Sequence, residues 1–211
     1  MFKTISSEVE TLIIEKKSKF IANIKPVKTE EEATEYIKSI KKKYNDARHH
    51  VYVYRLEKNV ERYTDDGEPA GTAGIPILEM LRKQDLTNIV VVVTRYFGGV
   101  LLGTGGLARA YTASAKESLN KVDVLENKLF LGLNITCSYT LSGKVQNRCE
   151  MLNIHIDNIK YEENVTFNIY VDINDKQKIV KDLIDLTGNN IKIQEVEEVF
   201  GLIKNNKFMR S

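Results

Sequence analysis

The chain of 211 residues has no tryptophan, three prolines and two cysteines, and its charges nearly cancel. Cys137 and Cys149 lack C-x-x-C spacing and have no accompanying histidine pair, which excludes a disulfide framework and a zinc site of the usual kind. We expect reduced, half-buried thiols. Because the formal net charge is only +2, no field of the whole molecule attracts polyanions. Nucleic-acid binding would therefore need a local cluster of cations.

Long hydrophobic runs are also missing. No segment approaches the ~20 apolar residues that cross a bilayer, and the residues after Met1 do not form the apolar core of a signal peptide. We therefore predict a soluble, cytoplasmic protein without a membrane partner. With 42% hydrophobic residues the chain can form one or two packed cores, which excludes disorder.

Apolar patterning in the first 120 residues predicts a mixed α/β arrangement. Thr29 and Glu32 form a capping box at the start of one helix, and the fixed φ of Pro76 suits the first turn of another. A continuously β-branched segment at 89–94 is typical of a strand buried on both faces. The pattern predicts strands at 9–14, 18–24, 50–56 and 89–94, and helices at 30–44, from 76 and at 107–119.

The pattern of predicted elements changes from residue 130. The predicted order there is strand, helix, two strands, helix, strand, at 131–136, 141–152, 154–159, 165–171, 175–187 and 191–196. Two βαβ halves of this kind in roughly 80 residues are typical of the ferredoxin-like split βαβ sandwich. We therefore place a domain boundary near 125–129, with one domain at 1–127 and a second at 128–211.

Glycine is concentrated between Gly67 and Gly106, and the second half of this window follows the buried strand. Glycines permit close approach of a ligand, and the free N–H groups of a helix N-terminus favour an anion. Arginines at both ends of the loop could add bidentate contacts to a phosphate. The predicted phosphate or nucleic-acid site comprises Arg95, Tyr96, Phe97, Gly98, Gly99, Gly103, Thr104, Gly105, Gly106 and Arg109.

A second loop, upstream, places Asp65, Asp66 and Glu68 within four residues. These carboxylates could bind Mg²⁺, act as general acid and base, or accept hydrogen bonds from a partner's amines. They could equally form a solvated turn. Of the adjacent His49 and His50, at most one can face a site from a strand, and we favour His49 as a supporting residue.

Known nucleotide-binding signatures are not found. The loop contains no G-x-x-x-x-G-K-[ST], and Gly103-x-Gly105 is not followed by a third glycine at the spacing of a dinucleotide fingerprint. We accordingly predict no cofactor and no metal, and no catalytic residue is assigned.

The two loops together closely resemble the YigZ/YvyE branch of the IMPACT family. The resemblance rests on two long motifs, at 65–74 and 93–107, and covers essentially the whole chain. It implies an α+β fold of two domains. The first is similar to a small-subunit ribosomal protein domain and to domain IV of elongation factor G, with a left-handed βαβ crossover; the second is similar to the last domain of elongation factor G.

The sequence departs from the family pattern at three positions. His49 matches the recurrent histidine, but His50 and Val51 stand where the family usually has Asn-Cys, and Ile75 replaces a residue that is often basic. A scheme that needs a cysteine nucleophile or a cation at 75 is thereby weakened. Eukaryotic members carry an additional RWD domain and modulate translational control through a kinase-activating partner, and this chain lacks that domain.

The sequence leaves three hypotheses for the function. The leading hypothesis is a non-catalytic regulatory protein that binds RNA or the ribosome through the glycine and arginine rim. The second is a Mg²⁺-dependent phosphotransferase or phosphoester hydrolase that uses the acidic loop. The third is a regulator that binds a protein partner in translational control without nucleic acid. No coiled-coil heptad indicates assembly, so we expect a monomer.

Overall fold

The computed structural model describes residues 2–204 and 207–210, so the predicted end points of the two domains, residues 1 and 211, lie outside it. The protein has an α+β fold of two compact units, Phe2–Leu125 and the residues from Glu126 onward. The sequence placed this boundary two residues later. Within the described ranges no helix is both long and apolar enough to cross a membrane.

The first unit is built on a five-stranded sheet in which every neighbouring pair is antiparallel. Its order is β2-β3-β6-β4-β5, so the connection from β3 to β4 passes over the central β6. All residues of β6 up to Arg95 are buried, as its β-branched run predicts. The strands are β2 (Val9–Glu15), β3 (Ser18–Pro26), β4 (His49–Arg55), β5 (Glu61–Thr64) and β6 (Ile89–Tyr96).

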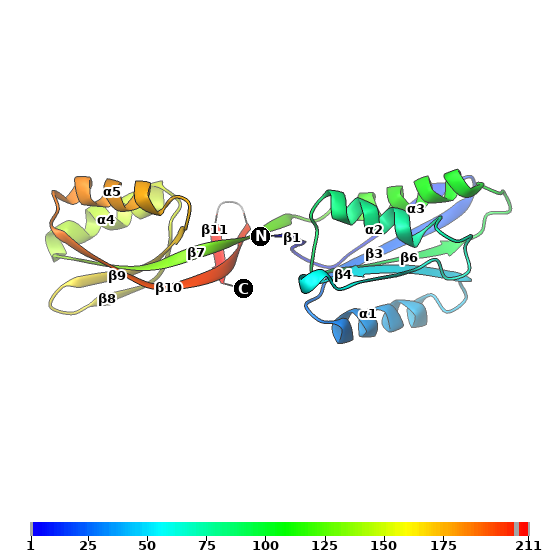
Figure 1. The fold of residues 1–211 in the computed structure, drawn as a ribbon, viewed down its shortest axis with the longest axis horizontal. Coiled ribbons are helices and arrows are strands. Elements are labelled where there is room, and N and C mark those ends of the chain that lie inside the picture. Colours follow the sequence, from blue (N-terminus) through cyan, green and yellow to red (C-terminus); the bar gives the residue numbers. More distant parts are fainter. Residues whose placement is uncertain (1, 205–206, 211) are drawn as a thin grey trace. The chain divides into compact units, whose positions relative to one another are not determined.

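Helices cover both faces of this sheet. Figure 1 shows α1 (Glu30–Lys43) on one face, with α2 (Gly74–Lys83) and α3 (Thr104–Leu119) on the other. Two cores result: α2 and α3 pack on Phe20 and its neighbours, whereas α1 packs on Val90 and Val92. The sequence did not predict β1 (Phe2–Ile5), β5 or the short helix η1 (Glu57–Asn59).

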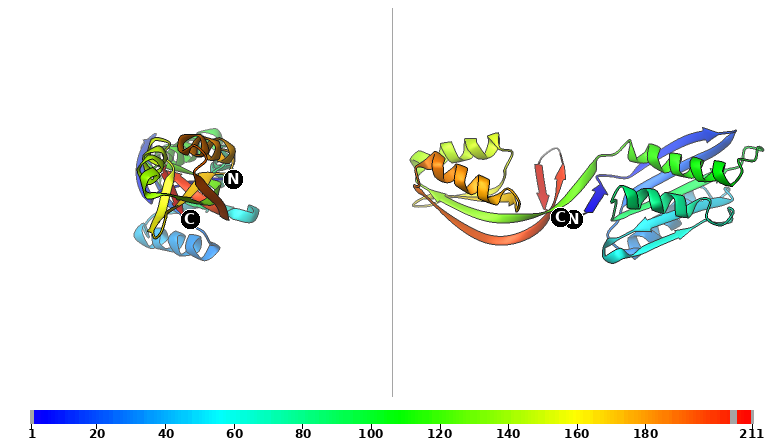
Figure 2. Two further views of the ribbon diagram at one scale, coloured as in Figure 1. Left: turned by 90° about the vertical axis from the view of Figure 1, so that its left-hand side faces the viewer. Right: turned by 45° about the horizontal axis from the view of Figure 1, so that its top comes forward.

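The second unit has the predicted order of a ferredoxin-like sandwich, followed by one strand, β11, that the sequence did not predict. Its sheet runs β11-β10-β7-β9-β8, and α4 and α5 lie together on one face of it (Figures 1 and 2). Cys137 and Cys149 are free, as predicted, but fully buried rather than half-buried. The elements are β7 (Val124–Cys137), α4 (Tyr139–Met151), β8 (His155–Tyr161), β9 (Val165–Asp172), α5 (Lys176–Thr187), β10 (Ile191–Lys204) and β11 (Lys207–Arg210).

Two helices begin earlier than their sequences predict. The first turn of α2 starts at Gly74 instead of Pro76, because the carboxylate of Asp65 accepts the N–H groups of Ala73 and Gly74. The first turn of α3 starts at Thr104 instead of Leu107, so glycines of the loop belong to the helix. Both differences come from the loops that precede the helices.

Candidate functional site

The glycine-rich loop between β6 and α3 is held by the turn between β2 and β3. The N–H of Gly98 donates to Ser18 Oγ at 3.1 Å. A Cβ on Gly98 would lie 2.0 Å from the carbonyl carbon of Lys17, a separation that no side chain tolerates. Glycine at this position is therefore required for the two segments to meet.

The turn itself has an unusual backbone. Lys16 and Lys17 both adopt positive φ, 45° and 68°, where a two-residue hairpin turn favours Asn-Gly. This backbone conformation costs a residue with a Cβ about 1–2 kcal/mol of conformational free energy. Both lysines are exposed, and neither makes an ion pair within the described part of the chain. The turn thus presents two unneutralised ammonium groups at the expense of local stability.

Helix α3 begins without a side-chain cap. Gly103 is its N-cap residue with φ +73°, and no side chain of the described residues bonds to the first-turn N–H groups. A Cβ on Gly105 would lie 3.4 Å from Nη1 of Arg109, so the Arg109 guanidinium lies beside the first turn. Partial positive charge from the helix and the full charge of Arg109 therefore meet at one place.

Two hollows flank Leu102, which lines both. The smaller, of about 240 Å³, includes Lys16 and Arg109 in its lining. The larger, of about 760 Å³, is bounded by the loop, by the start of α3 and by β4 and β6. Among the side chains that line the larger hollow are Arg48, His49, Glu68, Arg95, Tyr96, Phe97 and Thr104.

Arg95 does not occupy the place that the sequence predicts for it. Its side chain is only 6% exposed, and Nη1 donates to Glu68 Oε1 at 2.7 Å. The guanidinium carbon lies 5.4 Å from the ring centre of Phe20 and 5.6 Å from that of Phe97. The prediction that Arg95 contacts phosphate at an exposed rim is therefore wrong: the side chain points inward, where a buried carboxylate neutralises it.

Tyr111 of α3 completes this buried cluster. Its hydroxyl donates to the same oxygen of Glu68 at 2.7 Å, and burial raises the pKa of the phenol. The rings of Tyr111 and Phe20 pack edge to face with centres 5.1 Å apart. The cluster ties the second loop to β6 and α3 and forms the floor beneath the larger hollow.

The acidic loop is used internally. Asp65 accepts the N–H groups of Gly71, Ala73 and Gly74 at 2.8–3.0 Å and so caps α2. Asp66 accepts the N–H of His50 at 2.7 Å, and Glu68 holds Arg95. Three carboxylates within four residues thus have different partners. No group of three potential metal-binding side chains occurs among the described residues.

The two histidines face different surroundings. His49 lines the larger hollow, and its Nδ1 donates to the carbonyl oxygen of Asp66 at 2.9 Å. His50 is buried, and its Nδ1 lies 3.1 Å from Thr94 Oγ1. Burial lowers the pKa of His50. The residue favoured from the sequence, His49, is the one at the hollow.

Aromatic and aliphatic side chains frame the opening. Phe97 is 55% exposed and Leu101 is 83% exposed. The Tyr96 hydroxyl donates to Asp46 at 2.6 Å, and this hydrogen bond raises the pKa of Tyr96 to about 12. Phe97 therefore offers a free ring face, whereas the polar end of Tyr96 is engaged.

Sequence reasoning missed four cations at this end of the unit. Lys16 and Lys17 form the turn, Lys19 pairs through its backbone with Tyr96, and Arg48 lines the larger hollow. A lysine doublet between two strands was visible in the sequence, but not that the turn would reach the glycine loop. We define the basic end as Lys16, Lys17, Lys19, Arg48 and Arg109, all exposed and all without an ion pair to a described carboxylate.

Family models match both units. The Impact N-terminal domain matches residues 16–119, and a domain of unknown function, DUF1949, matches residues 135–190. Among solved structures, a crystal structure of a hypothetical protein aligns with a TM-score of 0.58 and 26% identity, over 93% of this chain and 97% of the other.

Curated relatives match over most of their length. IMPACT family member YvyE of Bacillus subtilis is 40% identical over 196 residues, which cover 92% of this chain and 90% of the relative. IMPACT family member YigZ of Escherichia coli is 28% identical over 187 residues, 87% of this chain and 92% of the relative. The chain therefore belongs to the IMPACT family.

Proposed function

We propose that the protein is a non-catalytic regulator of translation that binds RNA of the translation apparatus through the basic end of its first unit. The family resemblance, with its fold types related to ribosomal protein and elongation factor domains, supports this context. The observation that carries the proposal is the set of five exposed cations, none paired with a carboxylate of the described ranges, beside an uncapped helix N-terminus.

The distribution of charge supports a polyanionic ligand. Two carboxylates near this end have partners: Glu68 is paired with Arg95, and Asp46 accepts the Tyr96 hydroxyl, whereas Glu15 lies beside Lys16 and Arg109 in the lining of the smaller hollow. The five cations of the basic end therefore outnumber Glu15 and Asp46, the carboxylates beside them, although the whole chain carries only +2. Clustered lysines and arginines attract phosphates and release counterions, which gives an affinity that falls steeply with salt.

Exposed Phe97 supports RNA in particular. An aromatic ring at the mouth of the larger hollow can stack on an unpaired base, and single-stranded RNA offers such bases. Backbone N–H groups at the start of α3 and the hydroxyl of Thr104 lie next to this ring's loop and can contact phosphate or ribose. Arg95 has a supporting role, because its guanidinium lies beneath Phe97.

The test is co-sedimentation with purified bacterial ribosomes, and binding of a fluorescein-labelled single-stranded RNA, from about 50 to about 300 mM salt. We expect Lys16→Gln/Arg109→Gln to weaken binding. The slope of log affinity against log salt should fall by about one for each cation removed.

Lys38→Gln/Lys116→Gln is the matched control, since it removes two exposed cations of the same unit. Lys116 lies 12 residues after Thr104, about 18 Å along α3. This variant should bind like the unchanged protein. Equal binding by the two double variants, or no binding at the lowest salt, would overturn the proposal.

A further inference from the structure

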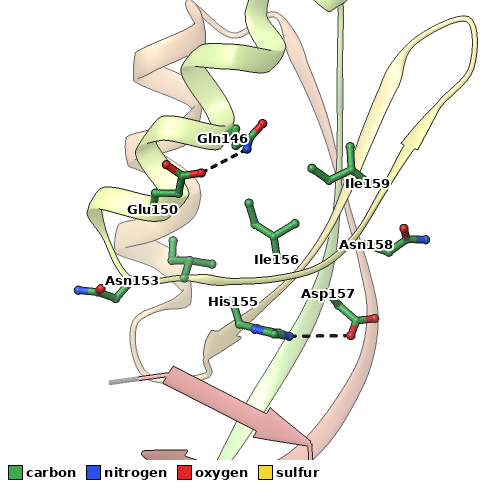
Figure 3. Close-up of a pocket in the computed structure, with 9 residues that line it drawn as sticks. Gln146, Glu150, Asn153, His155, Ile156, Asp157, Asn158 and Ile159 are labelled. Carbon is green, nitrogen blue, oxygen red and sulfur yellow. Dashed lines mark hydrogen bonds and ion pairs between the residues drawn. The ribbon is translucent and has the colours of Figure 1, made fainter. Parts of the chain in front are cut away.

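A groove of about 710 Å³ lies between α4 and β8 in the second unit, away from every residue used above. Figure 3 shows Ile156 and Ile159 on the side of β8 that faces α4, whereas His155 and Asp157 lie on the other side of the strand. Gln146 and Glu150, joined by a hydrogen bond of 3.2 Å, form the helical wall. The groove thus has an apolar floor and polar walls.

Exposed apolar side chains continue the groove at both ends. Tyr139 and Tyr161, 53% and 63% exposed, lie with ring centres 6.4 Å apart where α4 begins and β8 ends. Met151 is 68% exposed and Leu152 41% exposed, where α4 ends and the chain turns toward β8. A strip of uncovered apolar surface therefore follows β8 along its length.

The backbone of β8 is open on one edge. It is the last strand of its sheet and pairs with β9 alone among the described strands. An open edge of seven residues can pair with an added strand about 23 Å long, and such a strand would place alternate side chains beneath α4. A bulge between Ile156 and Asn158 leaves Asp157 unpaired with β9. This bulge displays the carboxylate at the middle of the edge.

The acidic side chains along the groove indicate the charge of the partner. Glu150, Asp157, Glu162 and Glu163 are exposed along the groove and the following turn. Lys160 is the one lysine or arginine within β8, and His155 Nε2 lies 3.9 Å from Asp157 Oδ1. A strand docked here meets isoleucines on one face and, at its centre, a carboxylate on the other. The complementary segment has aliphatic side chains at alternate positions with lysine or arginine between them.

We infer that β8 is a docking edge for an extended, cationic segment of a partner protein, which pairs as an added strand and inserts its apolar side chains between α4 and β8. The inference is independent of RNA binding, because it uses a different unit and ligand.

The experiment uses the full chain and a fluorescein-labelled, end-blocked peptide, Lys-Val-Lys-Ile-Lys-Val-Lys. We expect saturable binding and slower hydrogen exchange at the amides of β8. The same peptide with glutamate in place of lysine should bind at least about tenfold more weakly. In Glu150→Lys/Asp157→Lys, which changes two exposed side chains, the preference for the lysine peptide should reverse.

Ile156→Ser is a second variant, which leaves the charges in place and should weaken both peptides. Lys38→Gln/Lys116→Gln, in the first unit, should bind the lysine peptide normally. Unchanged exchange at β8 with the peptide in excess would overturn the inference, as would equal binding by the charge-reversed variant. A concentration-dependent dimer that the charge reversal abolishes would overturn it as well, in favour of a second copy of the chain as occupant.

Discussion

Arg95 and Glu68 form an ion pair of 2.7 Å between side chains that are only 6% and 4% exposed. Their sequence positions differ by 27 residues, so the pair links the strand β6 to the loop that precedes α2. The Tyr111 hydroxyl shares the same carboxylate oxygen. This arrangement makes Arg95 a structural residue and leaves ligand contact to the cations around it.

Removing the carboxylate should reveal this role. Glu68→Gln leaves a buried guanidinium without its counter-ion, and we expect a loss of about 3–5 kcal/mol in the free energy of unfolding by urea. Glu79→Gln is the control, because its partner Arg82 is 45% exposed and Glu79 itself 48%. That change should cost less than about 1 kcal/mol. Similar losses in both variants would contradict the structural role.

Two glycines should respond to alanine in opposite directions. Gly98→Ala forces a Cβ against the backbone of Lys17 and should lower unfolding stability by at least about 2 kcal/mol. Gly143→Ala, within α4, meets no atom within 4 Å and should raise stability by about 1 kcal/mol. Thermal melting of the two variants checks the pair, and a tolerant Gly98 position would show that the loop does not need this contact.

Asp65 should contribute as a helix cap. Asp65→Ala removes the acceptor of two N–H groups at the start of α2 and of a third, that of Gly71, in the loop before it, and we expect a loss of about 1–2 kcal/mol in denaturant unfolding. Asp175 precedes α5 but makes no side-chain cap hydrogen bond. Asp175→Ala should therefore change stability by less than about 0.5 kcal/mol, and equal effects would argue against the cap.

Stability should fall in mild acid because of His50. Burial lowers the pKa of this side chain from 6.5 in the folded state, so the unfolded chain binds a proton at a higher pH than the folded one. The contribution is fully present above the unfolded pKa and is lost as pH falls from about 6.5 toward the lower folded value. The urea midpoint should therefore rise with pH across this range. This dependence on pH should be weaker in His50→Gln and unchanged in His155→Gln.

Phe97 should matter for binding and little for stability. Phe97→Ala removes an exposed ring, and we expect RNA affinity to fall by about 1–3 kcal/mol per stacked base while the melting temperature changes little. Leu101→Ala removes an aliphatic side chain that is even more exposed and is the matched control. An RNA affinity that drops equally in both variants would point to loop packing instead of stacking.

Much of the fold could be predicted because the patterns that specify it are local. The β-branched run of β6 is visible in the sequence alone and indicates burial on both faces. The capping box of Thr29 and Glu32 marks the start of α1, and the Thr29 hydroxyl accepts the Glu32 N–H at 3.2 Å. Two short strands, β1 and β5, lack such patterns, since only their sheet or backbone partners make them strands.

The site was harder to predict, because contacts between residues far apart in the sequence decide which charged side chains are paired and which are free. Whether Arg95 is free or neutralised depends on Glu68, and whether Asp65 can bind a metal depends on where α2 begins. Arg109 resembles Arg95 in sequence context, yet one is exposed and the other buried. Only the packing of the two loops against β6 and α3 decides that Arg95 is buried and Arg109 exposed.

The left-handed backbone of Lys16 and Lys17 also offers an evolutionary marker. Asparagine and glycine at these positions would relieve the backbone strain without changing any packed side chain. A descendant of this chain that no longer needed the two ammonium groups would therefore gain heat resistance by drifting toward Asn-Gly. Across family members, we expect lysines at these two positions in proteins that retain the basic end, and Asn-Gly in proteins that have lost it.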